Sequence, residues 1–122
     1  MTITSIATFT MRAGREADAL ALIRAVKRQA EREQPGTLVY LVHLVHLVLD
    51  KKGKPTRTLY FYERYRNESA LKAHLASTSW QRVVAKWTEC FEGKSPKTGI
   101  DFFGVKRIAA FERAGAIPTA PS

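Results

Sequence analysis

The sequence predicts an α+β domain in which one antiparallel sheet of four strands carries helices on one face. Segments rich in β-branched and aromatic residues alternate with segments of helical apolar spacing, in the order β-α-β-β-α-β. The chain has 122 residues, of which 45% are hydrophobic. This length and composition suffice for one compact domain with a core that needs no disulfide.

The first strand and the first helix follow from the spacing of apolar residues. Residues 3–11 alternate apolar or small side chains with threonine and isoleucine, which is typical of a strand. Gly14 precedes a helix with two acidic residues in its first turn, the charge that a helix N-terminus favours. Pro35-Gly36 ends this helix. Its apolar positions form one stripe: Ala19, Leu22, Ile23, Val26 and Ala30.

A long hairpin is expected in the middle of the chain. Residues 37–49 and 57–66 are strand-like, and the lysine-rich residues 50–55 form the turn. Both faces of the second strand carry aromatic residues, so we expect both to be covered. His43 and His46 belong to a repeated Leu-Val-His triplet and point to opposite faces of a regular strand. A β-bulge would place both on one face, and the sequence leaves open which histidine faces a pocket.

Two helices are expected after the hairpin. Asn67 is a good N-cap for a short helix over residues 68–76. Thr78 and Gln81 match a capping box, so a second helix is expected to begin at Thr78 and to end at Gly93. This second helix has one wide apolar face: Trp80, Val83, Val84, Trp87 and Phe91.

The last predicted strand covers residues 100–111, so that residues 1–113 form one domain and residues 114–122 a flexible tail. The order of elements is that of the ferredoxin-like split βαβ pattern. Its helices cover only one face of the sheet. Because the other face is also apolar and aromatic, we expect two copies to pack face to face as a homodimer.

Charge and cysteine content limit the partners and the compartment. The net charge is +9, but basic residues are spread over both halves of the chain, which favours a solvated basic surface over a nucleic-acid footprint. The longest apolar run, residues 38–49, is too short for the roughly 20 residues of a membrane span. The start of the chain lacks a signal-peptide pattern. With Cys90 as the single cysteine, a cytoplasmic protein is expected.

His74 is the main candidate for chemistry, because it lies on the inner face of an apolar short helix. It is either a base or hydrogen-bonding group in a pocket, or a core histidine bonded to a backbone carbonyl. Candidates for contacting a ligand there are Tyr62, Tyr65, Trp80 and His43, with ordinary packing as the other interpretation. The three histidines show no ligand spacing for a metal, and nucleotide or flavin motifs are missing, so neither metal nor cofactor is expected.

Residues 61–77, followed by Trp80-Gln81, resemble the signature of the antibiotic biosynthesis monooxygenase (ABM) family. The shared pattern is an aromatic strand with a glutamate, a further aromatic residue, an Ala-Leu pair, a histidine and a serine. The Gln-Pro-Gly-Thr of residues 34–37 also matches. The resemblance covers about residues 3–112 and implies a dimeric α+β barrel. Some members oxidise quinols or polyketide-derived phenols with O₂ and neither metal nor flavin.

This resemblance makes His74, at the family's histidine position, the candidate catalytic base, and Tyr65 stands where many relatives have tryptophan. The haem-degrading branch of the superfamily is disfavoured, because Val84 stands at its ligand position and residues 3–10 contain no asparagine. The expected function is a cofactor-independent monooxygenase acting on an aromatic or quinol-like small molecule. The alternative is a non-catalytic α+β-barrel protein that binds a small ligand. The sequence does not identify the substrate.

Overall fold

The computed structural model describes residues 2–47 and 53–115. A four-stranded sheet with the order β2-β3-β1-β4 is antiparallel at each contact between neighbouring strands. The predicted ferredoxin-like α+β class is therefore confirmed. The elements in chain order are β1 (Ile3–Thr10), α1 (Glu16–Glu33), β2 (Thr37–Leu47), β3 (Lys54–Tyr65), α2 (Glu68–Leu75), α3 (Thr78–Ala85), α4 (Trp87–Cys90), α5 (Pro96–Gly99) and β4 (Asp101–Val105).

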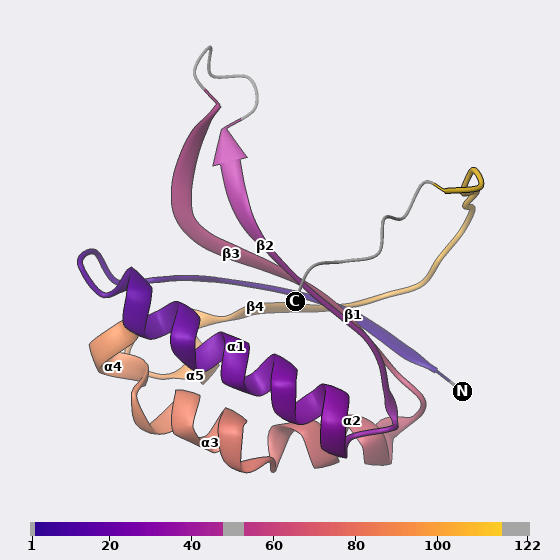
Figure 1. Ribbon diagram of the computed structural model, residues 1–122, viewed down its shortest axis with the longest axis horizontal. Helices are drawn as coiled ribbons and strands as arrows, with labels where there is room; N and C mark the ends of the chain where they lie inside the picture. Colours follow the sequence, from indigo (N-terminus) through magenta and orange to yellow (C-terminus); the bar gives the residue numbers. More distant parts are fainter. Residues whose placement is uncertain (1, 48–52, 116–122) are drawn as a thin grey trace.

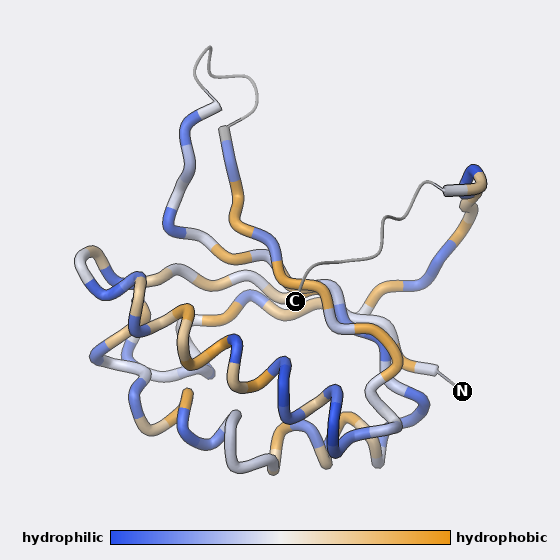
Figure 2. Tube along the Cα trace, in the orientation of Figure 1, coloured by the Kyte–Doolittle hydropathy of each residue, from blue (hydrophilic) through white to orange (hydrophobic). Residues whose placement is uncertain are grey.

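All of the described helices lie on one side of the sheet (Figure 1). Every second residue points to that side and is buried from Ser5 to Phe9 in β1 and from Leu59 to Tyr65 in β3. Hydrophobic and hydrophilic segments alternate along α1 (Figure 2), whose buried residues are Ala19, Ile23, Val26 and Ala30. The core between the layers is aromatic: the rings of Phe9 and Phe61 stack at 4.6 Å, and Trp87 packs 5.2 Å from Phe9. No helix in the described part of the chain is long and apolar enough to cross a membrane.

The last strand is shorter than predicted, since β4 ends at Val105 and not at residue 111. Its pairing with β1 runs out there: Val105 lies opposite Thr4, and β1 begins only one residue earlier. Residues 106–113 have no regular structure, and Ile108 and Phe111 are 89% and 78% exposed. The apolar pattern predicted a strand that is too long, because it does not show where the neighbouring strand ends.

The predicted helix begins at Thr78 as expected, but its N-cap and its end differ from the prediction. Ser77 is the N-cap, and its hydroxyl accepts a hydrogen bond from the backbone N–H of Trp80 at 3.3 Å. The helix breaks at Lys86 into α3 and α4, which turns Trp87 into the core and leaves Val84 37% exposed. Then α4 ends at Cys90, before Gly93, because the next residue becomes extended and bridges to the end of β1.

The hairpin contains the predicted irregularity between the two histidines. Leu44 pairs with Leu59 and His46 with Pro55, so β2 advances two residues while β3 advances four. The extra residues therefore lie in β3 and not in the histidine repeat. The second strand begins at Lys54, earlier than predicted. The predicted turn and the end of the first hairpin strand fall partly on residues 48–52, outside the described residues.

Candidate functional site

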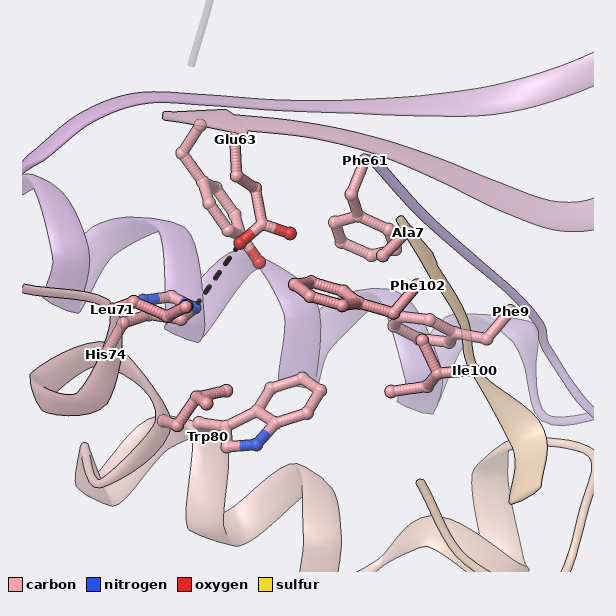
Figure 3. Close-up of a pocket in the computed structure, with 11 residues that line it drawn as sticks. Ala7, Phe9, Phe61, Glu63, Leu71, His74, Trp80, Ile100 and Phe102 are labelled. Atoms are coloured by element: carbon pink, nitrogen blue, oxygen red, sulfur yellow. Dashed lines mark ion pairs between the residues drawn. The ribbon is translucent and has the colours of Figure 1, made fainter. Parts of the chain in front are cut away.

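A small cavity of about 60 Å³ lies between the sheet and the helices α2 and α3, and it is partly open to solvent (Figure 3). Its polar lining residues are Tyr40, Glu63 and His74. The rest of the wall is apolar and half of it is aromatic, including Phe9, Phe61, Leu71, Trp80, Ile100 and Phe102. A cavity of this kind suits a flat apolar molecule that carries a small number of polar groups.

His74 is held at the cavity by α2, whose first turn is capped by Asn67. The side chain is 2% exposed, and its Nδ1 lies 2.8 Å from the Oε1 of Gln34. The partner is thus a side-chain amide and not the backbone carbonyl that the core-histidine interpretation expected. Burial lowers the pKa of His74 from its ordinary 6.5 to about 4, so the imidazole is neutral at pH 7.

The amide of Gln34 determines which imidazole nitrogen carries the proton. The structure places its carbonyl oxygen Oε1, and not its nitrogen, toward Nδ1, and the same Oε1 accepts a hydrogen bond from the hydroxyl of Thr37 at 3.3 Å. A carbonyl oxygen requires a donor at Nδ1 of His74. The lone pair of Nε2 therefore faces Glu63, whose Oε1 lies 4.0 Å away.

A close approach of two chain segments brings Gln34 and His74 together. Gln34 is the C-cap of α1, and the turn that follows contains Gly36. A Cβ atom on Gly36 would lie 2.6 Å from the Cβ of Ala70 in α2, so only glycine allows this contact. The backbone N–H of Arg66 also donates to the Gly36 carbonyl at 2.8 Å. Ala70 precedes His74 by one helical turn, and this places the histidine against the end of α1.

Glu63 is a buried carboxyl group beside this histidine, with 8% of its surface exposed. It accepts a hydrogen bond from the hydroxyl of Tyr65, which is fully buried. Burial raises the pKa of Glu63, although the bond from Tyr65 opposes this change. Burial and the neighbouring Glu63 raise the pKa of Tyr65, and the same two causes raise that of Tyr40. Both tyrosines therefore keep their protons at neutral pH.

The structure brings only part of the predicted site together. His74 and Trp80 line the cavity, and Tyr65 lies directly behind it through Glu63. Tyr62 and His43 point to the open face of the sheet, where Tyr62 contacts Arg64 and the ring of His43 lies near Tyr60. They do not line this cavity, because successive residues of a strand face opposite sides.

Three residues of the site were not predicted from the sequence: Gln34, Glu63 and Tyr40. One signal was present for Glu63: it occupies an acidic position in the alternating apolar set of β3 that faces the helices. Gln34 lies 40 residues from His74, and no local pattern predicts their contact. Within residues 2–47 and 53–115, no three His, Cys, Asp or Glu side chains gather as a metal site would require.

The fold and the cavity define a small ferredoxin-like α+β domain with a buried histidine and carboxyl group at an apolar cavity. Residues 2–86 match the family described as antibiotic biosynthesis monooxygenase, and the chain belongs to this family. The match includes Gln34, Glu63, His74 and Trp80. It ends before Ile100 and the other cavity residues of the C-terminal part.

Solved structures agree in fold. The Pseudomonas aeruginosa protein PA3566 superposes with a TM-score of 0.68 at 21% identity over 88% of this chain and 95% of its own. The Mycobacterium tuberculosis protein Rv0793 has a TM-score of 0.66 at 21% identity over 90% of this chain and 100% of its own. A structure described as an antibiotic biosynthesis monooxygenase gives 0.65 at 19% identity, covering 89% and 100%. A search of curated proteins found no significant match.

Proposed function

We propose that the protein is a cofactor-independent monooxygenase that oxidises a hydroxylated aromatic small molecule, a phenol or hydroquinone, with O₂. The observation that carries this proposal is the pairing of an aromatic-lined cavity with a neutral imidazole whose Nε2 lone pair is free to accept a hydrogen bond. Family membership supports the same reaction class. The aromatic wall orients a flat substrate, and the imidazole receives its hydroxyl group.

The reaction needs no outside reductant if the substrate supplies all the electrons. A hydroquinone and O₂ give a hydroxyquinone and water. One oxygen atom forms a bond to a ring carbon, and the other leaves in water with two hydrogens of the substrate. An electron-rich phenolate can pass electrons to O₂ directly. The protein therefore has to bind the substrate, exclude water, and accept and return the hydroxyl proton.

His74 is the group that we assign to the proton. With a pKa of about 4 it is a weak base, so it first accepts a hydrogen bond from the substrate hydroxyl. It takes the proton as negative charge leaves the ring for O₂, and returns it when water forms. The carboxyl group of Glu63, 4.0 Å from Nε2, stabilises the imidazolium while it exists.

The test is O₂ uptake by purified protein with a panel of hydroquinones and naphthols, corrected for spontaneous oxidation. We expect His74→Phe to lower turnover by about 10²–10⁴ while the far-UV circular dichroism spectrum is kept. The matched control is His46→Phe, an exposed histidine of the hairpin that should retain wild-type turnover. Uptake at the spontaneous rate with every compound would contradict the proposal. Binding without turnover would favour the non-catalytic ligand-binding alternative.

We also infer that two copies form a homodimer, in the cytoplasm as the single buried cysteine favours. In the described part of the chain no helix covers the second sheet face (Figure 1), and Phe103 on β4 is 55% exposed. Ile108 and Phe111 are exposed as well, and apolar surface of this extent is typical of an interface. Light scattering should give twice the 13.7 kDa of one chain, and a clean monomer would contradict the dimer.

A further inference from the structure

We infer that Gln34 is a positioning residue that fixes His74 in one tautomer, so that the site selects ligands that donate a hydrogen bond. This inference rests on the proposed function for its substrate class, but its geometry is independent of turnover. It concerns a glutamine outside the cavity lining, at the end of α1. As a consequence, the site binds a quinol-like ligand in its reduced form more tightly than in its oxidised form.

In the structure the carbonyl oxygen of the Gln34 amide faces both Thr37 and His74. Its Oε1 lies 3.3 Å from the Thr37 hydroxyl and 2.8 Å from Nδ1 of His74. The backbone of Gln34 is fixed on both sides, because its N–H donates to the Ala30 carbonyl and its own carbonyl accepts from the N–H of Thr37. This backbone holds the side chain of Gln34 next to His74, and with Oε1 at Nδ1 the Nδ1–H tautomer follows.

The surroundings of His74 leave Nε2 available to a ligand. The hydroxyl of Ser77 donates to the backbone carbonyl of His74 at 2.7 Å, which holds the end of α2. Nε2 points across to Glu63 (Figure 3), and at 4.0 Å the two atoms are too far apart for a direct hydrogen bond. The Oε1 of Glu63 already accepts the hydroxyl proton of Tyr65. At this end of the cavity a ligand thus meets two hydrogen-bond acceptors, Nε2 of His74 and Oε1 of Glu63.

A site with this tautomer discriminates between the two sides of the proposed reaction. A phenol or hydroquinone presents an O–H to Nε2 and is held. A quinone or an aryl methyl ether presents only oxygen lone pairs to Nε2. The ligand oxygen and Nε2 are then both acceptors, so they repel each other and neither gains a hydrogen bond. In the hydroxyquinone product the hydroxyl that donated to Nε2 has become a carbonyl, and the new hydroxyl lies on another ring carbon. The product is therefore held less tightly in the orientation that bound the substrate.

The first experiment observes the tautomer without any ligand. Two-bond ¹H–¹⁵N NMR correlations of the imidazole should show Nδ1 protonated and Nε2 unprotonated in wild type at pH 7. Gln34→Leu removes the acceptor and should move the signals toward the Nε2–H form, whereas Gln34→Glu keeps an acceptor and should restore the Nδ1–H pattern. Gln29→Leu is the matched control on α1, because Gln29 bonds Thr78 and Ser79 and not His74.

The second experiment measures selectivity with 1-naphthol and 1-methoxynaphthalene as probes. We expect wild type to bind 1-naphthol about tenfold more tightly, and Gln34→Leu to lose most of this ratio. An Nε2–H tautomer in wild type, or equal affinity of wild type for both probes, would overturn the inference. Should Gln34→Leu fail to fold, the wild-type spectrum and Gln34→Glu decide the question. An Nδ1–H tautomer in a protein without O₂ uptake would contradict the proposed function and leave this inference standing.

Discussion

The burial of His74 should make the unfolding free energy depend on pH, and a substitution at His74 separates this dependence from that of the other titrating groups. Its pKa is about 4 in the folded chain and 6.5 when exposed, so between these values the unfolded chain binds more protons than the folded one. The contribution of His74 is fully present above pH 6.5 and is lost as the pH falls toward 4. The difference of about 2.5 pH units corresponds to about 3 kcal/mol of unfolding free energy.

Glu63 acts in the opposite direction over part of the same range. Burial raises its pKa above the ordinary 4.5, so its contribution to stability is present below pH 4.5 and is lost as the pH rises through the folded value. The wild-type curve alone therefore mixes two opposing effects. Replacing His74 by Phe removes the titrating imidazole and keeps Glu63, so the difference between the two curves reports the histidine.

The assay is denaturant unfolding followed by far-UV circular dichroism at several pH values from 7.5 to 4.5. Protein concentration is held constant, because the stability of a dimer depends on it. We expect the wild-type unfolding free energy to fall relative to His74→Phe by up to about 3 kcal/mol as the pH decreases. The exposed His43 supplies the control, and His43→Gln should follow wild type. Parallel curves for wild type and His74→Phe would refute the argument that a neutral imidazole is buried here.

Three further substitutions test the packing around the site by thermal or denaturant unfolding. Gly36→Ala should lower the unfolding free energy by about 1–3 kcal/mol, because its Cβ would lie 2.6 Å from that of Ala70; wild-type stability would show that α2 moves freely. Ser77→Ala should lower the unfolding free energy by about 1 kcal/mol, because it removes the N-cap of α3, and Thr78→Ala should lower it distinctly less. The reverse order would show that Thr78 is the N-cap, as the sequence predicted. Ser5→Ala should raise the unfolding free energy by about 1 kcal/mol, because no described residue bonds its buried hydroxyl, and a loss would reveal a hidden partner.

The fold was predictable where one periodic pattern spans a whole element. The stripe of α1 and the alternation of β3 each identify a buried face, and four of the five predicted stripe residues of α1 are buried. The end of β4 was not predictable in this way, because strand length depends on where β1 begins. The cap of α3 was misassigned because Ser77 and Thr78 are neighbours with equally suitable hydroxyl groups, and only the structure shows which one faces the N–H of Trp80.

The site was predictable only for the residues that a local helix face determines. His74 and Trp80 lie on the inner faces of α2 and α3, as their spacing indicated. Tyr62 and Tyr65 occupy opposite faces of β3, and both faces are rich in aromatic residues, so the pattern alone does not show which face the helices cover. Gln34 joins the site through a contact across 40 residues that depends on the Gly36–Ala70 approach, and such a contact has no signature in one sequence.

The positions of the two tryptophans give the chain two separable fluorescence signals. Trp80 is half-buried at the cavity wall, whereas Trp87 is 1% exposed, with its Nε1–H bonded to the Glu92 carbonyl at 3.1 Å and its ring against Gly99. A soluble quencher such as iodide therefore reaches the emission of Trp80 and not that of Trp87. Aromatic compounds that enter the cavity quench the first signal, and loss of the core shifts the second toward the red. Occupancy and folding can thus be followed in one unlabelled sample.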